Sequence, residues 1–232
     1  MRQRAARGAL NPPEDAMTLP DTASNAGDDL SNGYEAVASE FMRRRQPHLG
    51  VAAVRSWARS LAPGSSVLDL GCGHGVPVSR TLIHDGFVVY GVDASPTLTA
   101  AFRRRLPHAH VACEAVESSG FFARTFGGIV AVGLIFLLPP EVQRRLIRRV
   151  ALALDPGGRV LFTSPAQACT WADGLTGVLS RSLGAKAYEA ELLGAGLTLA
   201  NEHEDEGGNH YFDACRPPAH SPDAARYHLR TY

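Results

Sequence analysis

The chain has 232 residues, of which 45% are hydrophobic, and its 23 lysines and arginines balance 23 aspartates and glutamates. A chain of this size can bury one sizeable core, so we expect one principal domain. The balanced charge argues against a nucleic-acid partner, because domains that bind nucleic acid normally carry a net basic charge. No stretch approaches the roughly 18 apolar residues of a membrane span, and no apolar segment follows the arginine-rich start as in a secretory signal. We therefore expect a cytoplasmic protein with no membrane partner.

Four cysteines, Cys72, Cys113, Cys169 and Cys215, are scattered along the chain without the paired spacing of a metal site. In a chain of this length such cysteines are typical of a reducing compartment. We expect free thiols, most of them buried, and no bound metal.

Residues 1–30 are rich in Pro, Asp, Asn, Gly and Ala and lack an apolar period, which predicts a disordered leader. Met17 offers an alternative start, which would make the first sixteen residues an extension. From Tyr34, "YEAVASEFMRRR" places apolar residues three and four apart, a pattern typical of an amphipathic helix. A second helix is expected over residues 48–61, where an Ala-Pro-Gly sequence ends it.

From residue 66 onward, short apolar runs alternate with helical patterns. The expected strands are 66–70, 87–92, 110–113, 128–132 and 159–163. The expected helices between them are 76–84, 96–106 and 140–154. This alternation predicts βαβ units and therefore an α/β fold with a mostly parallel sheet.

The last third of the chain departs from this alternation. Residues 164–185 are too long for a simple connection, and we interpret them as a substrate lid inserted into a domain of residues 31–216. A helix at 186–196 follows, and then two strands separated by Gly207-Gly208, which predicts an antiparallel hairpin. Residues 217–232 carry no strong pattern and are expected to form a tail.

The stretch "VLDLGCGHG" runs from an apolar strand into a glycine-rich turn, which is the nucleotide-binding arrangement of doubly wound folds. A dinucleotide fingerprint, G-x-G-x-x-G, requires a glycine where Val76 stands. Asp69, two residues before the first glycine, would repel a pyrophosphate but attract the ammonium and sulfonium groups of S-adenosylmethionine. The sequence therefore favours S-adenosylmethionine over a dinucleotide.

A second acid supports this interpretation. Asp93 ends the next strand, twenty positions after Gly73, where a carboxylate accepts hydrogen bonds from ribose hydroxyls. The alternative is that Asp93 only caps the helix that follows. After the third strand, Glu114 and the backbone of Ala115 and Val116 are expected beside the adenine.

These motifs resemble those of the class I S-adenosylmethionine-dependent methyltransferases of small-molecule type, over residues 34–216. "VLDLGCGHG" is similar to their first motif, "VYGVDAS" to their acidic second-strand motif, and "LALDPGGRVLFT" to the segment that leads into strand five. The resemblance implies a Rossmann-like doubly wound sheet of seven strands, mostly parallel, with a C-terminal antiparallel hairpin. One departure is Gly127, which stands where the family usually has an aspartate.

The resemblance also implies a cofactor site. Asp69 and the Gly71–Gly73 backbone would hold the methionine moiety, and an N-terminal helix with Tyr34 and Arg45 would fold over the cofactor. The alternative for these two residues is a core tyrosine and a solvated arginine. The full set of implied cofactor-binding residues is Tyr34, Arg45, Asp69, Gly71, Cys72, Gly73, Asp93, Ala94, Glu114, Ala115, Val116, Gly133 and Leu134.

The methyl acceptor should lie beyond the carboxyl ends of strands four and five. We expect Phe136, Trp171 and Tyr211 to contact it, and His210 to act as general base if the acceptor is a hydroxyl. The alternative is that the aromatic residues belong to the core and that His210 lies on a polar hairpin. The apolar loop "GLIFLLPPE" lacks the Asn or Asp that enzymes acting on adenine or glutamine amides carry before Pro-Pro. This loop favours a small aromatic or heterocyclic metabolite with an O, N or S nucleophile.

Other classes of function stay open at this stage. Asp69 and Val76 argue against a nicotinamide-dependent dehydrogenase. Intact cofactor motifs are also compatible with a cofactor-binding protein without catalysis, or with a methyltransferase that acts on a macromolecule. A monomer and a homodimer are equally compatible with the sequence.

Overall fold

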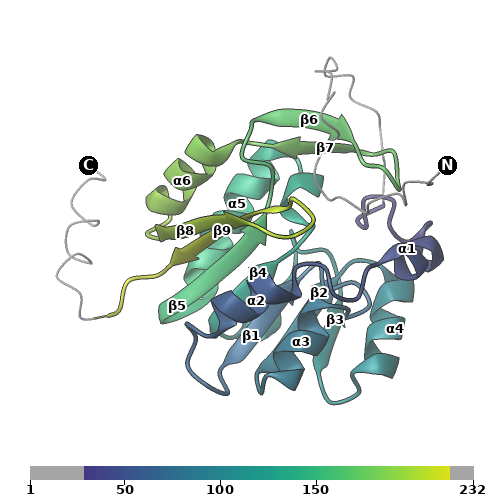
Figure 1. The fold of residues 1–232 in the computed structure, drawn as a ribbon, viewed down its shortest axis with the longest axis horizontal. Coiled ribbons are helices and arrows are strands. Elements are labelled where there is room, and N and C mark those ends of the chain that lie inside the picture. The colour runs from purple at the N-terminus through teal and green to yellow at the C-terminus, as the bar shows by residue number, and fades with distance from the viewer. Residues whose placement is uncertain (1–28, 220–232) are drawn as a thin grey trace.

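The computed structural model describes residues 29–219, so the greater part of the expected leader and tail lies outside the described residues. The helices are α1 (Ala38–Arg44), α2 (Val51–Ala58), α3 (Val78–His84), α4 (Pro96–Arg105), α5 (Pro140–Ala153) and α6 (Ala185–Gly194) (Figure 1). The strands are β1 (Ser66–Leu70), β2 (Val88–Asp93), β3 (His110–Cys113), β4 (Phe126–Ala131), β5 (Leu154–Thr163), β6 (Cys169–Ala172), β7 (Leu179–Ser182), β8 (Thr198–Glu204) and β9 (His210–Cys215). Two short 3₁₀ turns, η1 (Phe121–Ala123) and η2 (Ile135–Leu137), flank β4.

Seven strands form one sheet in the order β3-β2-β1-β4-β5-β9-β8. All neighbouring strands from β3 to β5 run parallel, whereas β9 is antiparallel to both β5 and β8. The predicted fold class, a mostly parallel doubly wound sheet with a C-terminal antiparallel hairpin, is confirmed. Because the chain reverses its direction of winding between β1 and β4, the carboxyl ends of these strands form the crevice in which such folds bind ligands.

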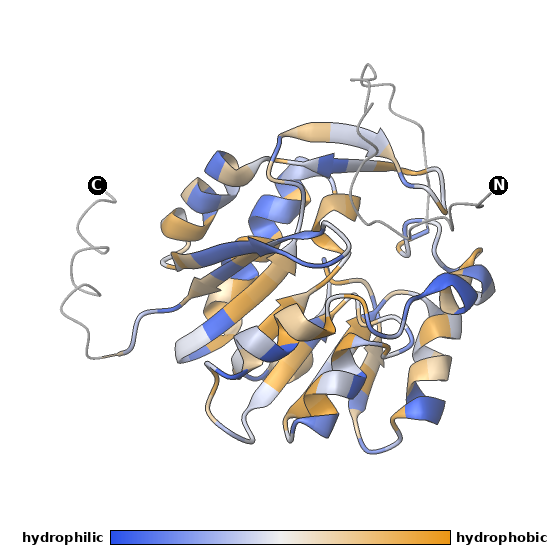
Figure 2. Ribbon diagram, in the orientation of Figure 1, coloured by the Kyte–Doolittle hydropathy of each residue, from blue (hydrophilic) through white to orange (hydrophobic). Residues whose placement is uncertain are grey.

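Helices cover both faces of the sheet because alternate strand residues point to opposite sides. Leu68 of β1 and Ile129 of β4 join the core under α5 and α6, whereas Val67 joins the core under α2 and α3. Figure 2 shows the central strands as largely apolar, with polar residues on the surrounding helices and along β8.

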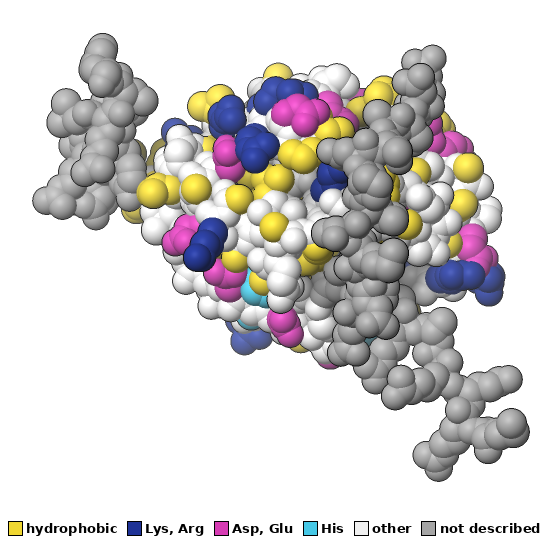
Figure 3. Space-filling view, turned by 90° about the horizontal axis from the view of Figure 1, so that it is seen from above, with side chains coloured by type: hydrophobic (Ala, Val, Ile, Leu, Met, Phe, Trp, Pro, Cys, Tyr) yellow, Lys and Arg dark blue, Asp and Glu magenta, His cyan; other side chains and the backbone are white. Residues whose placement is uncertain are grey.

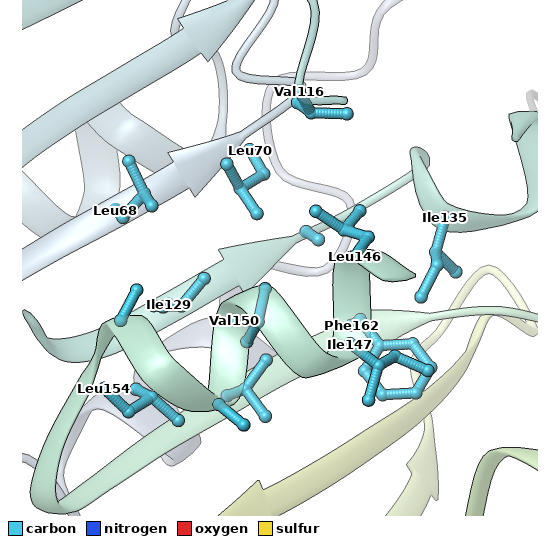
Figure 4. Packing of buried hydrophobic residues seen from close by; sticks show 14 of the residues in the cluster. Leu68, Leu70, Val116, Ile129, Ile135, Leu146, Ile147, Val150, Leu154 and Phe162 are labelled. Atoms are coloured by element: carbon cyan, nitrogen blue, oxygen red, sulfur yellow. The ribbon is translucent and has the colours of Figure 1, made fainter. Parts of the chain in front are cut away.

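Helix α5 contributes more buried residues than any other element to the core under α5 and α6. Its buried residues Leu146, Ile147 and Val150 recur at helical spacing and lie against Leu154 and Phe162 of β5 (Figure 4). Each fully buried aliphatic side chain of this kind stabilises the fold by about 1.5–3 kcal/mol. The sheet is thereby fixed directly beneath the loops that follow β3 and β4.

The N-terminal segment differs from the predicted helix. Residues 31–37 form turns, and α1 begins only at Ala38. The carboxylate of Asp29 accepts hydrogen bonds from the backbone N–H groups of Ser31 and Gly33, both at 2.9 Å, so two residues of the expected leader, Asp29 and Leu30, belong to the described structure. Side-chain contacts of these turns to other elements replace the first helical turn, as described below.

The predicted insertion at 164–185 contains a two-stranded antiparallel sheet, β6–β7, that the sequence analysis did not anticipate. Its carboxyl-terminal strand packs on η2, the turn after β4. The hairpin lies above the carboxyl edge of the main sheet (Figure 1).

The cysteine prediction was half correct. All four thiols are free, but only Cys72 is buried, while Cys113 is exposed and Cys169 and Cys215 are half-buried. Within residues 29–219, no group of three His, Cys, Asp or Glu side chains is arranged to hold a metal, and no helix is long and apolar enough to cross a membrane. The face seen in Figure 3 carries basic and acidic side chains interspersed, without a field of one sign.

Gly127, the departure from the family pattern, has a steric explanation. A Cβ at this position would lie 2.9 Å from Cβ of Ser65, closer than real Cβ atoms approach. The loop before β1 therefore occupies the space that an aspartate side chain would need.

Candidate cofactor and acceptor site

A cavity opens at the carboxyl ends of β1, β2 and β4, where doubly wound folds bind their ligands. It lies at the crevice where the winding of the sheet reverses. The chain segments that line it are residues 30–45, the glycine loop, the starts of α4 and of the loop after β3, and the turn after β4. Eleven of the thirteen predicted cofactor residues line this cavity: Tyr34, Arg45, Asp69, Gly71, Cys72, Gly73, Asp93, Ala94, Val116, Gly133 and Leu134.

The glycine loop is held tightly on both sides. The backbone N–H groups of Gly71 and Cys72 donate to the Val92 carbonyl at 2.8 and 3.1 Å, which ties the loop to β2. Gly71 and Gly73 have φ values of 68° and 53°, a region that favours glycine. A Cβ on Gly71 would lie 3.0 Å from Cβ of Leu134, so a larger residue would displace the turn after β4.

Asp69 projects from β1 into the floor of the cavity and is 2% exposed. The Ser79 hydroxyl of α3 donates to its carboxylate at 2.5 Å. Burial raises the pKa of Asp69 to about 7, against the opposing effects of the Ser79 hydrogen bond and of Arg45. A nearby cation would stabilise the ionised form of such a buried carboxyl group and lower its pKa.

Arg45 follows α1 and lines the same end of the cavity. Its Nε is buried and has no hydrogen-bond partner in the described part of the chain, and its guanidinium lies 5.8 Å from the Phe41 ring centroid. Burial lowers the pKa of Arg45, whereas Tyr211, Tyr34 and Asp69 favour its charge. An unpaired buried donor beside a buried carboxyl group fits a zwitterion, with a carboxylate for Arg45 and an ammonium for Asp69.

Asp93 lies at the end of β2 with both carboxylate oxygens directed to backbone. Oδ2 accepts from the Gly73 N–H at 2.8 Å and Oδ1 from the Ser95 N–H at 2.9 Å. The helix cap itself is Ser95, whose hydroxyl accepts from the Leu98 N–H at 3.1 Å. Asp93 therefore braces the glycine loop and keeps acceptor capacity on a residue that lines the cavity.

The loop after β3 is shifted relative to the prediction. Val116 and Glu117 line the cavity, but Glu114 and Ala115 do not. The Glu114 N–H donates to the Asp93 carbonyl, and the Ala115 carbonyl accepts from Ser118 and Ser119, so these two residues form the base of a turn. Glu117 was missed because nothing in the local sequence reports where such a turn directs its tip.

The segment Leu30–Glu35, which we call the strap, contributes Leu30, Ser31, Asn32 and Tyr34 to the cavity lining. Tyr34 donates its hydroxyl to Asp173 Oδ2 of the β6–β7 hairpin at 3.1 Å. On the opposite side, Glu35 accepts from the Thr97 N–H at 3.1 Å and the Thr97 hydroxyl at 2.6 Å at the start of α4. The strap thus joins the start of α4 to the inserted hairpin.

Phe41 also covers the cavity and was missed by the sequence analysis. Its ring meets Tyr34 edge-on, with centroids 5.4 Å apart, and meets His74 at 5.7 Å. The signal was present, because Phe41 lies on the predicted apolar stripe that starts at Tyr34. Burial, followed by three nearby arginines, lowers the pKa of His74 to about 4, so this imidazole is neutral at pH 7.

The predicted acceptor residues are not brought together. Phe136 and Trp171 are 2% and 7% exposed and pack on each other at 5.3 Å, and neither lines the cavity. Tyr211 is buried in the core under α2 and α3, where its hydroxyl donates to Asp205 at 3.1 Å.

His210 lies on the opposite face of the sheet from Tyr211. Its ring meets Phe212, a member of the core under α5 and α6, at 4.8 Å, and Nε2 lies 2.7 Å from Glu202 of β8. It does not line the cavity. The structure therefore does not place His210 where a general base for a bound acceptor is needed, because adjacent residues on β9 point to opposite faces.

Comparison with known proteins agrees with this geometry. Residues 67–158 match the family model described as a methyltransferase domain. The chain is similar to the aklanonic acid methyltransferase DauC of Streptomyces sp. strain C5, at 34% identity over 153 residues, which cover 61% of this chain and 64% of that protein. It is also similar to the carboxy-S-adenosyl-L-methionine synthase of Chromohalobacter salexigens, at 36% identity over 112 residues, 45% of this chain and 42% of that one. The matched part of the chain thus spans 42% and 64% of the length of these two curated relatives.

Among solved structures, the fold resembles the Burkholderia thailandensis 1,6-didemethyltoxoflavin-N1-methyltransferase with bound 1,6-didemethyltoxoflavin and S-adenosylhomocysteine. The TM-score is 0.66 at 20% identity, covering 88% of this chain and 97% of that one. Residues 67–158 therefore match a methyltransferase domain model, and the described chain has a Rossmann-like fold similar to that of this solved methyltransferase.

Proposed function

We propose that this protein is an S-adenosylmethionine-dependent methyltransferase that acts on a small, aromatic or heterocyclic metabolite. The observation that carries the proposal is a pair of ionisable groups of opposite sign at one end of the cavity, the buried Asp69 carboxyl group and the half-buried Arg45. Among the described residues, Asp69 has one side-chain partner, Ser79, and the buried Nε of Arg45 has none. A pyrophosphate would gain nothing from Asp69, whereas an amino-acid moiety uses both groups.

In this proposal Asp69 receives the ammonium and Arg45 the carboxylate of the methionine moiety. Asp93 receives the ribose hydroxyls, and the loop with Val116 borders the adenine. When bound, S-adenosylmethionine supplies an electrophilic methyl group on a sulfonium. The chain contributes orientation and exclusion of water, and the strap and the β6–β7 hairpin, proposed here as a substrate lid, close the cavity for this purpose.

The acceptor class follows from the remainder of the cavity lining. Val132, Leu134 and Leu137 supply apolar surface near the end of β4, and the strap adds the Ser31 hydroxyl and the Asn32 amide. This surface suits a flat, partly hydrophobic molecule with an O, N or S nucleophile. The likeness to a methyltransferase of aklanonic acid and to one with bound didemethyltoxoflavin supports such an acceptor.

The free thiols support a cytoplasmic location within this proposal. A monomer or a homodimer is proposed, with neither a nucleic-acid nor a membrane partner. A cofactor-binding protein without catalysis is the alternative, and the same cavity would serve it.

Calorimetry with S-adenosylhomocysteine and with NAD tests the cofactor. We expect micromolar binding of the first and none of the second, and the reverse result would overturn the proposal. Asp93→Ala should lower the affinity for S-adenosylhomocysteine by about 10- to 100-fold, which is the effect expected when hydrogen bonds to a charged acceptor are lost. Asp85→Ala is the matched control, because Asp85 pairs with Arg55 at the surface, away from the cavity.

A metabolite screen that detects S-adenosylhomocysteine formation tests catalysis. Turnover of an aromatic or heterocyclic metabolite supports the proposal. Turnover of a protein or RNA fraction alone would contradict the small-molecule acceptor, and binding without any turnover would favour the non-catalytic alternative.

A further inference from the structure

Arg149, on the outer part of α5, contacts the loop after β3 rather than any acidic partner. Its Nη1 donates to the carbonyls of Val116 and Glu117 at 2.6 and 2.8 Å, and its Nη2 donates to the carbonyl of Ser119. The guanidinium also lies 4.4 Å from the ring centroid of Phe121. A single side chain therefore binds three of the four carbonyls between residues 116 and 119.

These contacts fix the direction of the peptide planes in the loop. In a trans peptide the C=O of one residue and the N–H of the next point in opposite directions. Because the Val116 carbonyl faces Arg149, the N–H of Glu117 faces away from α5. This N–H donates to no acceptor in the described part of the chain, whereas the next one, of Ser118, donates to the Ala115 carbonyl at 3.2 Å.

The free donor lies at the cavity. Val116 and Glu117 both line it, and Arg149 does not. The loop is thus held from the α5 side by the guanidinium and presents its unpaired N–H on its other flank. A planar base with a ring nitrogen as acceptor fits a free backbone donor next to the buried Val116 side chain.

We propose that Arg149 is a positioning residue for the adenine end of the cofactor: it holds the loop of residues 116–119 so that the Glu117 N–H donates to a ring nitrogen of the base. The inference rests on the proposed function. Arg149 touches neither cofactor nor acceptor and acts only through the loop. A lysine cannot replace it fully, because an ammonium lacks the planar fork that reaches several carbonyls at once.

The test compares two ligands that differ only in the base. S-inosylhomocysteine carries a proton on ring nitrogen N1 and cannot accept a hydrogen bond there, whereas S-adenosylhomocysteine can. We expect the wild-type protein to prefer S-adenosylhomocysteine by about tenfold in calorimetry. Arg149→Ala should lower the affinity for S-adenosylhomocysteine by about tenfold. It should also reduce the preference for S-adenosylhomocysteine over S-inosylhomocysteine to about twofold or less, and Arg149→Lys should give intermediate values.

Arg148→Ala is the matched control, because Arg148 lies next along α5 but pairs with Glu191 of α6 at 3.5 Å. It should leave both affinities and their ratio unchanged. Hydrogen exchange of the ligand-free protein supplies a second readout: the amides of Ser118 and Ser119, which donate to the Ala115 carbonyl, should exchange faster in Arg149→Ala than in Arg148→Ala.

A merely structural role predicts a different pattern. If Arg149→Ala lowered both affinities equally, or kept the wild-type preference for adenine, the inference would be overturned. If Arg149→Ala failed to fold, the preference measured for Arg149→Lys would decide in the same way. A wild-type protein that bound neither ligand would instead refute the proposed function itself.

Discussion

The proposed cofactor site and the residues expected at the acceptor differ in how their polar groups are used. At the proposed cofactor site, the ionisable side chains of Asp69, Arg45 and Asp93 line the cavity, are buried or half-buried, and are incompletely paired within the described chain. Of the residues expected at the acceptor, His210 and Tyr211 lie outside the cavity, and their polar groups are paired with Glu202 and Asp205.

The aromatic side chains show the same contrast. Phe41 lines the cavity at the proposed cofactor site, whereas Phe136 and Trp171 pack on each other away from it. In this comparison the incompletely paired ionisable groups coincide with the cavity, whereas the chemically versatile residues expected at the acceptor do not. The five predictions below test this contrast, from the largest expected effect to the smallest.

Asp69→Asn should cause the largest loss of affinity for S-adenosylhomocysteine. It keeps the shape of the side chain but removes the charge that pairs with the ligand ammonium, and we expect S-adenosylhomocysteine to bind about 100-fold more weakly. The ligand-free variant should be at least as stable as wild type at pH 8, because no charge is then buried. Ser79→Ala, which keeps the Asp69 carboxylate, is the control, and its affinity for S-adenosylhomocysteine should fall by less than about fivefold. Calorimetry and thermal unfolding measure both quantities.

The affinity for S-adenosylhomocysteine should also depend on pH through Asp69. Its folded-state pKa, about 7, lies above the ordinary 3.8, so its contribution to stability is present at low pH and is lost as the pH rises through 7. Ligand binding requires the carboxylate, so affinity should rise by about 10- to 30-fold between about pH 5.5 and 7.5. His74, with a pKa of about 4, stays neutral over this range.

Asp69→Asn should remove this pH dependence. Calorimetry in buffers of different ionisation enthalpy should show a proton released on binding to wild type near pH 6 and none for the variant. If the pH dependence of the affinity were unchanged in Asp69→Asn, the released proton would come from another group.

Arg45→Met should lower the affinity for S-adenosylhomocysteine by about tenfold, because the ligand carboxylate loses a charged hydrogen-bond donor. An analogue that lacks this carboxylate should bind both proteins equally. Arg43→Met is the control, since Arg43 pairs with Glu40 on the outer face of α1. A similar loss for both ligands would show that Arg45 only supports the packing of Phe41.

Tyr34→Phe should have a smaller effect, on the strap that joins the start of α4 to the inserted hairpin. It removes the hydrogen bond to Asp173 and keeps the ring against Phe41. We expect S-adenosylhomocysteine to dissociate about three- to fivefold faster, as for the loss of one partly exposed hydrogen bond. Stopped-flow fluorescence measures this rate. In a double-mutant cycle with Asp173→Ala, additive effects would show that the two residues do not act together.

The sequence predicted the parts of this molecule whose information is local. The strands at 66–70 and 110–113 have the predicted bounds, and the glycine loop follows its strand as expected. A strand–turn–helix unit is specified by its own residues, so the charges near the turn could be placed from the sequence.

The remaining features depend on contacts between distant segments. Strands β6 and β7 are four residues each, which is too short for their residue pattern to distinguish a strand from a loop. The first turn of the predicted α1 is replaced by contacts of Tyr34 and Glu35 to residues 173 and 97. The loop after β3 takes its direction from Arg149, more than thirty positions away.

His210→Ala should have the smallest effect on cofactor binding and turnover. The imidazole is on the face of the sheet that packs under α5 and α6, its Nε2 is paired with Glu202, and it does not line the cavity. We expect unchanged affinity for S-adenosylhomocysteine and a change in turnover below about threefold, against the roughly 10²- to 10⁴-fold loss that removal of a general base causes. Thermal unfolding should report a modest loss of stability, because the contact with Phe212 disappears. Glu202→Gln serves as the control: it removes the charge of the partner and should leave turnover equally unaffected. A loss of turnover of about a hundredfold with a hydroxyl acceptor, together with a wild-type value for Glu202→Gln, would show that the β8–β9 hairpin delivers His210 to the acceptor and that the contrast between the proposed cofactor site and the residues expected at the acceptor is wrong.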